Sequence, residues 1–79
     1  MKMNTVESDT LAAIGYDDAY GILQLEFRSR TIYRYFDVPG GVHEELVAAA
    51  SKGRYFNGAI RGQYRDEVAV DKRLSPILS

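Results

Sequence analysis

Two groups of residues in this chain have the types and spacing for binding nucleic acid. In Thr31–Val38 an arginine stands between two tyrosines, as Tyr33-Arg34-Tyr35, and tyrosine rings on an exposed strand can stack on bases. The second group is basic, and arginine in particular matches the geometry of a phosphate group. The candidate phosphate contacts are Arg30, Arg34, Lys52, Arg54, Arg61 and Arg65.

Charge is distributed unevenly along the chain. The formal net charge is −1, yet the segment 28–65 holds seven basic and three acidic residues, a net charge of +4, and the remainder carries −5. A basic segment of this kind is a modest indication of a polyanionic partner. An ordinary solvated surface would account for the same charges equally well.

Residues for catalysis or metal binding are sparse. The chain has no cysteine and one histidine, His43, which we expect on an exposed helix face. Glu44 and Glu45 are adjacent, so on a helix their side chains diverge by about 100° and do not form an acid–base pair. Ser51 has no evident base beside it, and no glycine-rich phosphate loop is present. We therefore expect no enzymatic activity, no metal and no cofactor.

The elements that position these residues can be read from the hydrophobic pattern. Alternating apolar residues predict strands over 11–16, 22–27 and 31–37, with a turn at Asp17–Gly21. Pro39 suits the first position of a helix that runs to about residue 50, and Gly53 is predicted to end it in a left-handed cap. A second helix is expected over Arg54–Arg61, ending at Gly62.

The predicted fold is α+β: a three-stranded antiparallel meander followed by two short helices packed on one sheet face. The domain is expected over residues 9–65, with residues 1–8 and 66–79 as flexible tails. A chain of 79 residues forms one domain, and no apolar run approaches the roughly 20 residues that a membrane span needs. We expect a soluble cytoplasmic protein that does not associate with membranes.

The length of the second hairpin loop decides which way the tyrosines face, because a shift of one residue moves every side chain to the other face. A two-residue loop, Ser29–Arg30, would place Tyr33 and Tyr35 on the polar face and Arg34 among apolar residues, which is costly. A three-residue loop would place the tyrosines on the apolar face and Arg34 opposite Gln24. We favour the second register, in which Arg30 takes up a left-handed conformation and Tyr33 and Tyr35 are core residues.

Several spaced motifs resemble the KTSC domain family. They are Tyr33-Arg34-Tyr35, Asp37-Val38-Pro39, the run from Ser51 to Asn57, Ile60-Arg61 and Tyr64, and the match extends from about Asp9 to Tyr64. The resemblance implies a short bacterial domain of unassigned function that occurs at the C-terminus of some lysyl-tRNA synthetases and as a stand-alone protein. It implies no catalytic residues. The family usually has glycine where Arg30 stands, and Gly40-Gly41 also departs from the family pattern.

Two functional hypotheses follow. The first is a small non-catalytic module that binds nucleic acid, RNA or single-stranded DNA, through its basic residues, and the synthetase context makes RNA the more plausible ligand. The second is a protein-interaction or assembly module with no nucleic-acid role. The favoured register places Ile32 and Phe36 on the open sheet face, where they could form a homodimer contact.

Overall fold

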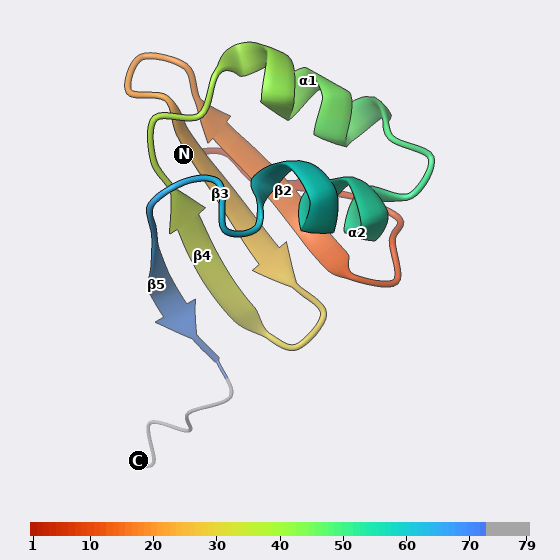
Figure 1. Cartoon of the computed structure of the whole chain (residues 1–79). Coiled ribbons are helices and arrows are strands. Elements are labelled where there is room, and N and C mark those ends of the chain that lie inside the picture. Colours follow the sequence, from red (N-terminus) through yellow and green to blue (C-terminus); the bar gives the residue numbers. More distant parts are fainter. Residues whose placement is uncertain (73–79) are drawn as a thin grey trace, which may run out of the picture.

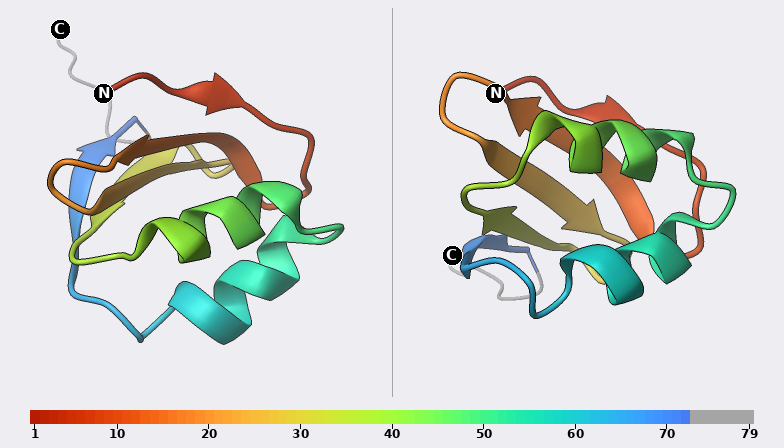
Figure 2. Two further views of the ribbon diagram at one scale, coloured as in Figure 1. Left: turned by 90° about the horizontal axis from the view of Figure 1, so that it is seen from above. Right: turned by 45° about the horizontal axis from the view of Figure 1, so that its top comes forward.

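The computed structural model describes residues 1–72 and shows one five-stranded antiparallel sheet with its helical segments on one face (Figures 1 and 2). The strands follow the chain in spatial order, from β1 at one edge to β5 at the other. Their bounds are β1 Asn4–Thr5, β2 Leu11–Asp17, β3 Ile22–Phe27, β4 Thr31–Tyr35 and β5 Asp66–Asp71. The helical segments are α1 Gly40–Ala48, α2 Lys52–Tyr55 and the π-helical turn η1 Phe56–Ile60 that continues α2.

The α+β class, the antiparallel β2–β3–β4 meander and the placement of both helices on one face are confirmed. The prediction of three strands is wrong, because both expected tails contribute a strand. Near the N-terminus, β1 pairs with β2 through Asn4 and Thr5. Near the C-terminus, β5 pairs with β4 from Asp66 to Asp71, with one β-bulge in the ladder. Residues 73–79, the rest of the expected C-terminal tail, lie outside the described part of the chain.

Strand β5 was missed because its apolar signal is weak. Val68 and Val70 alternate with other residues, but acidic residues stand at both ends of the strand. A β-bulge between Ile32 and Tyr33 also interrupts its pairing with β4. The two valines remain 51% and 46% exposed, so the strand is held mainly by backbone pairing with β4 rather than by burial. Edge strands are often this short and polar, because an apolar edge would promote aggregation.

The hairpin register that places the tyrosines with the apolar residues is confirmed. Leu25 pairs with Tyr33, Leu23 pairs with Tyr35, and Gln24 pairs with Arg34. The loop is the three-residue form, with Arg30 N–H donating to the Phe27 carbonyl at 2.9 Å. Arg30 has a φ of 75°, in the left-handed region that disfavours residues other than glycine. The observed register keeps Arg34 on the polar face of the sheet, where its charge does not have to be buried.

Replacing Arg30 by glycine should raise the free energy of unfolding by about 1 kcal/mol, because the left-handed conformation is strained for arginine and free of strain for glycine. Urea denaturation of the variant measures this gain. Ser29→Gly is the matched control, since Ser29 is in the same loop but has no positive φ. It should be neutral or slightly destabilising, and an equal gain from both variants would contradict the explanation by strain.

The helices differ from the prediction around Gly53. Helix α1 begins after Pro39, which is its N-cap, and already ends at Ala48. Helix α2 begins after Ser51, whose hydroxyl accepts the Arg54 N–H at 3.3 Å. Gly53 is thus a buried residue inside α2 and not a left-handed stop, which corrects the prediction. Its role is close approach: a Cβ at this position would collide with the Thr10 side chain. The predicted end of the second helical segment is confirmed, since Gly62 has a φ of 75° directly after η1 and Arg61.

The core lies between the helix-covered face of the sheet and the helices. Its buried residues come from β2, β3, β4, α1 and η1 and from Val38 between β4 and α1. Leu46 is the one fully buried residue of α1. Phe56 and Ile60, four residues apart on η1, both point into it, as their spacing predicted. The cluster comprises Leu11, Ile14, Leu23, Leu25, Tyr35, Val38, Leu46, Phe56 and Ile60. This core fixes the position of α2 and η1 over β3 and β4.

Candidate functional site

The two tyrosines of β4 share the helix-side face but differ in exposure. Tyr35 is 3% exposed and belongs to the core, while Tyr33, next to it, is only half-buried. Their rings are roughly parallel, with centroids 6.2 Å apart. Phe27 meets Tyr33 edge-on and Phe56 meets Tyr35 edge-on, at 5.7 and 5.8 Å. The prediction of core residues therefore holds for Tyr35, whereas Tyr33 is at the rim of the core.

Beside Tyr33 the surface forms a cavity of about 390 Å³ between β4 and η1, which we call the aromatic hollow. Aromatic rings make up its apolar wall, and polar side chains from η1 and from the start of β5 stand around it. The principal lining residues are Phe27, Tyr33, Tyr35, Phe56, Asn57, Arg61 and Asp66. The rings come from segments far apart in sequence, so the hollow could not be found from a single motif.

Two opposite charges act on the wall of the aromatic hollow. Burial raises the pKa of the Tyr35 hydroxyl well above its usual value, and the nearby Asp66 carboxylate and Tyr33 raise it further, while Arg61 lowers it. Tyr35 is therefore a neutral hydroxyl at physiological pH. Asp66 pairs with Tyr35 across the β4–β5 ladder, and Arg61 donates a 3.5 Å hydrogen bond to the Asn57 side-chain carbonyl. Acidic and basic groups thus face the same cavity.

Three of the six predicted basic residues are exposed on or beside the helical side of the molecule. Arg54 lies on α2, Arg61 directly follows η1, and Arg30 is at the tip of the β3–β4 loop next to Ser29, which also lines the hollow. Within residues 1–72, no carboxylate forms an ion pair with Arg54 or Arg61. Apart from the long hydrogen bond from Arg61 to Asn57, their guanidinium groups are available for an anionic ligand.

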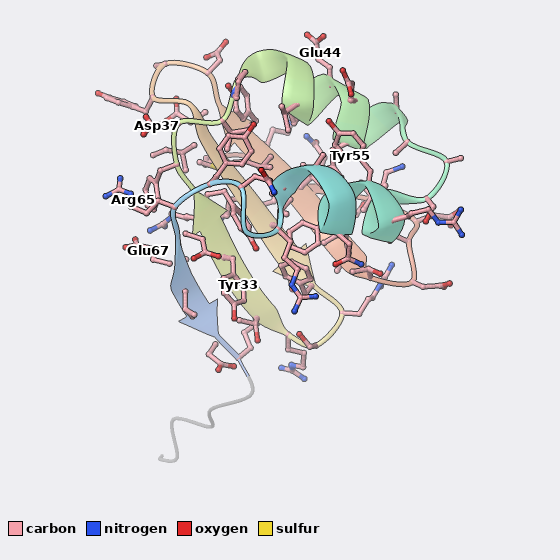
Figure 3. All side chains as sticks on the ribbon, in the orientation of Figure 1. Tyr33, Asp37, Glu44, Tyr55, Arg65 and Glu67 are labelled. Atoms are coloured by element: carbon pink, nitrogen blue, oxygen red, sulfur yellow. The ribbon has the colours of Figure 1, made fainter. Side chains whose placement is uncertain are left out.

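The other three predicted residues are placed differently. Lys52 is partly buried and donates to the Ala49 carbonyl at 3.1 Å, which anchors the end of α1. Arg34 projects from the opposite face of the sheet and donates to the Gln24 side-chain carbonyl at 2.8 Å. Arg65 lies over the Phe36 ring, 4.5 Å from its centroid, and Figure 3 shows it pointing outward beside the entry to β5. The six residues therefore do not form one continuous basic patch.

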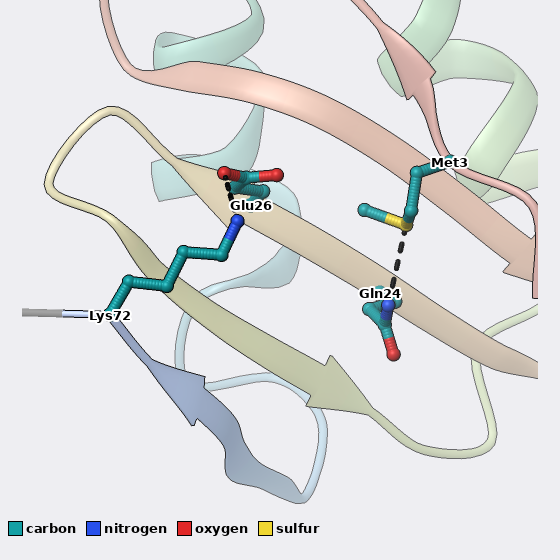
Figure 4. A network of polar contacts seen from close by, with 4 residues as sticks. All are labelled: Met3, Gln24, Glu26 and Lys72. Atoms are coloured by element: carbon teal, nitrogen blue, oxygen red, sulfur yellow. Dashed lines mark hydrogen bonds and ion pairs between the residues drawn. The ribbon is translucent and has the colours of Figure 1, made fainter. Parts of the chain in front are cut away.

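Arg34 does not pair with the Glu26 carboxylate on the neighbouring strand. Glu26 instead accepts from Lys72, with a nitrogen–oxygen distance of 3.2 Å, and this ion pair ties the end of β5 to β3 (Figure 4). On the same face, Gln24 donates to the Met3 sulfur at 3.4 Å (Figure 4). The N-terminal segment thus crosses the sheet face opposite the helices, where Gly15 leaves room for Met3. This covering segment was expected to be a flexible tail.

A second cavity, of about 600 Å³, lies between the N-terminal segment and the start of α2. Glu7 and Asp9 line it together with Arg28 and Lys52, so its charges balance. Arg28 is already engaged, because it donates to the Ser8 and Val6 carbonyls at 3.0 and 3.2 Å. Lys52 is likewise engaged with Ala49. This cavity is therefore a weaker candidate for binding an anion than the surface around Arg61.

Similarity to known proteins agrees with the motifs. The family model of the KTSC domain matches residues 7–64. The chain belongs to the KTSC domain family. The crystal structure of a KTSC domain protein from Yersinia pestis superposes with a TM-score of 0.85 at 33% sequence identity, covering 87% of this chain and 97% of that one.

Relatives of this KTSC domain include both short proteins and much longer enzymes. A protein of Tsukamurella paurometabola is 43% identical over 63 residues, which are 80% of this chain and 94% of that protein. A lysine–tRNA ligase of a Nostoc species is 46% identical over 61 residues, which are 77% of this chain but only 11% of the ligase. The domain therefore occurs both nearly alone and as a small part of a much larger enzyme.

Other classes of site receive no support from the described residues. In residues 1–72, no three histidine or acidic side chains are grouped so that they could hold a metal ion. No helix in that part of the chain is long and apolar enough to cross a membrane. His43 is half-buried and not exposed as expected, because its ring stacks on Tyr16 with centroids 4.7 Å apart. The aromatic hollow and the arginines around it are thus the best candidate site.

Proposed function

We propose that this KTSC domain is a non-catalytic RNA-binding module that contacts RNA with its helical side. The observation that carries the proposal is the aromatic hollow, which has the half-exposed Tyr33 ring beside Arg61 and opens on the same side as Arg54. Proteins that bind single-stranded nucleic acid combine aromatic rings for the bases with basic groups for the backbone. The presence of a homologous segment in lysine–tRNA ligases supports RNA as the polymer, since those enzymes act on tRNA.

The proposed phosphate contacts are Arg30, Arg54 and Arg61. All three are exposed, and Arg54 and Arg61 have no ion-pair partner within residues 1–72. Arg34 and Arg65 are assigned no role, because their side chains are engaged elsewhere with Gln24 and Phe36. With a net charge of −1 for the whole protein, long-range attraction to RNA is weak, so binding depends on these local contacts.

Salt dependence tests the proposal. Each phosphate contact to a single strand contributes about −0.7 to the slope of log affinity against log salt. Three contacts should therefore lower the affinity about 20-fold between roughly 50 and 200 mM salt. The double variant Arg54→Ala/Arg61→Ala should lose only about threefold over the same range. Fluorescence anisotropy with labelled single-stranded RNA and a tRNA transcript measures both, and single-stranded DNA in parallel reports the preference for RNA.

The matched control is Arg34→Ala/Arg65→Ala, which removes the same charge from residues outside the proposed contact face. It should keep the salt dependence of the unmodified protein. Two results would contradict the proposal: no RNA binding at about 50 mM salt, or equal losses from the two double variants. Equal losses would mean that net charge alone governs binding.

A protein-interaction module remains the second candidate, and one observation favours it. Ile32 pairs with Val70 on the sheet face away from the helices, and Val70 is exposed. Phe36, the other proposed dimer residue, is half-buried and carries the Arg65 guanidinium on its ring, which leaves less apolar surface than expected. Sedimentation from micromolar to millimolar protein tests the homodimer form of this alternative, because a monomer at every concentration would remove the support that Ile32 and Phe36 give it.

A further inference from the structure

We propose that the aromatic hollow holds one unpaired guanine base of the bound RNA, stacked at Tyr33 with its Watson–Crick edge at Asp66. This inference rests on the proposed RNA-binding function and names the nucleotide that the hollow would select. It starts from the shape of the cavity. At about 390 Å³ the hollow is at the small end of the range of ligand sites, which suits a single ring system rather than a folded segment.

The walls of the hollow suit a flat aromatic ligand. Tyr33 offers the half-exposed ring, and Phe27 and Tyr35 hold it from two sides at centroid distances of 5.7 and 6.2 Å. A ring fixed in this way loses little conformational entropy when a base stacks on it. Phe56 closes the inner end of the cavity through its contacts with Phe27 and Tyr35, at 5.2 and 5.8 Å.

Asp66 distinguishes among the bases. Its carboxylate is exposed, lines the hollow and has no hydrogen-bond partner within residues 1–72. An ionised carboxylate only accepts hydrogen bonds, through two oxygens side by side. Guanine presents two adjacent donors on its Watson–Crick edge, N1–H and the N2 amino group, and so matches the carboxylate with two parallel bonds. Uracil, cytosine and adenine each place an acceptor beside the donor, which would face a carboxylate oxygen.

Arg61 balances the negative charge that Asp66 brings to an RNA site. Both groups act on the Tyr35 hydroxyl from around the same cavity. Arg61 would contact the phosphate of the same nucleotide while Asp66 accepts hydrogen bonds from the base. Each charged side chain would then face a group of opposite polarity. A carboxylate without such a neighbour would repel the strand.

The test compares three RNA strands of about ten nucleotides, a length that spans a typical single-strand site. One is all uridine, one has a single central guanine, and one has a single central abasic site, so all carry the same phosphates. The unmodified protein should bind the guanine strand about 5- to 150-fold more tightly than the uridine strand. The abasic strand should bind no better than the uridine strand.

Two variants and one control locate the effect. Asp66→Asn should abolish the preference for guanine, because an amide can no longer accept two parallel bonds, and its position on an exposed edge strand should leave the fold intact. Tyr33→Ser should weaken binding of the guanine strand most, because it removes the ring on which the guanine stacks. Tyr20→Ser, which removes a tyrosine that is 76% exposed in the β2–β3 turn, should change none of the three affinities.

Each outcome decides between the two proposals. Equal binding of the three strands by the unmodified protein would overturn the guanine site and leave the RNA-binding function standing. A guanine preference that survives in Asp66→Asn would also overturn it. Failure to bind any strand would remove the RNA-binding function and the guanine site with it. If Tyr33→Ser does not fold, Asp66→Asn alone carries the test.

Discussion

Leu46→Ala should lower the free energy of unfolding by about 2–5 kcal/mol, the largest effect that we expect from a single substitution in this domain. Leu46 is completely inaccessible to solvent and is the one buried residue of α1. Truncation leaves a cavity beneath the helix that the surrounding core cannot fill. Because small domains have only about 5–15 kcal/mol of net stability, the loss is a large fraction of the total.

Urea denaturation followed by circular dichroism measures this loss. The neighbouring Val47→Ala is the control, since Val47 is 46% exposed on the same helix. It should lower the free energy of unfolding by only on the order of 0.5 kcal/mol, as is usual for surface substitutions and much less than Leu46→Ala. Equal costs for the two variants would mean that α1 is not anchored through Leu46 and would contradict the packing described above.

Gly53→Ala should destabilise the protein by up to about 2 kcal/mol, although alanine is the better helix former. The intrinsic preference of a helix for alanine over glycine is worth about 1 kcal/mol. Here it is outweighed, because the added Cβ would fall on the Thr10 hydroxyl and 3.0 Å from the Thr10 Cβ. Overpacking of this kind typically costs about 1–3 kcal/mol, here chiefly because the Thr10 hydroxyl is displaced from its position.

Two further variants isolate the cause. Gly58→Ala on η1 places its Cβ in open space, so it should stabilise the protein by about 0.5–1 kcal/mol. In a Thr10→Ala background, Gly53→Ala should cost much less than in the unmodified protein, and a double-mutant cycle of the four proteins measures this coupling. A cycle with no coupling would show that Gly53 is not required by its contact with Thr10.

The role of Gly53 could not be predicted from the sequence, because it depends on a contact between residues far apart in the chain. Glycine between two helical patterns normally indicates a stop, and nothing local reveals that residue 10 packs against residue 53. The register of the β3–β4 hairpin was predictable for the opposite reason. It depends on whether Arg34 is buried with Leu23 and Leu25, and this local charge argument gave the observed pairing.

The candidate site was predicted less well than the fold. Sequence indicated basic residues from Arg30 to Arg65, but their grouping depends on strand alternation, which sends Arg34 to the far face, and on a contact with Phe36 that occupies Arg65. The aromatic hollow joins Phe27, Tyr33 and Phe56 to Asp66. The sequence predicted a flexible tail at Asp66. The hollow could not be predicted, because it depends on the pairing of β5 with β4 that brings Asp66 next to Tyr35.

The central claim is that RNA binds on the helical side of this KTSC domain, around the aromatic hollow. A proton–nitrogen NMR titration of the uniformly labelled protein with single-stranded RNA tests it most directly, because it reports binding and location together. We predict amide shift changes concentrated in Arg54–Gly62 and Ser29–Tyr33, with Gln24 and Met3 on the opposite face unchanged. No shift changes at about 50 mM salt, or changes centred on Gln24 and Arg34, would contradict the claim.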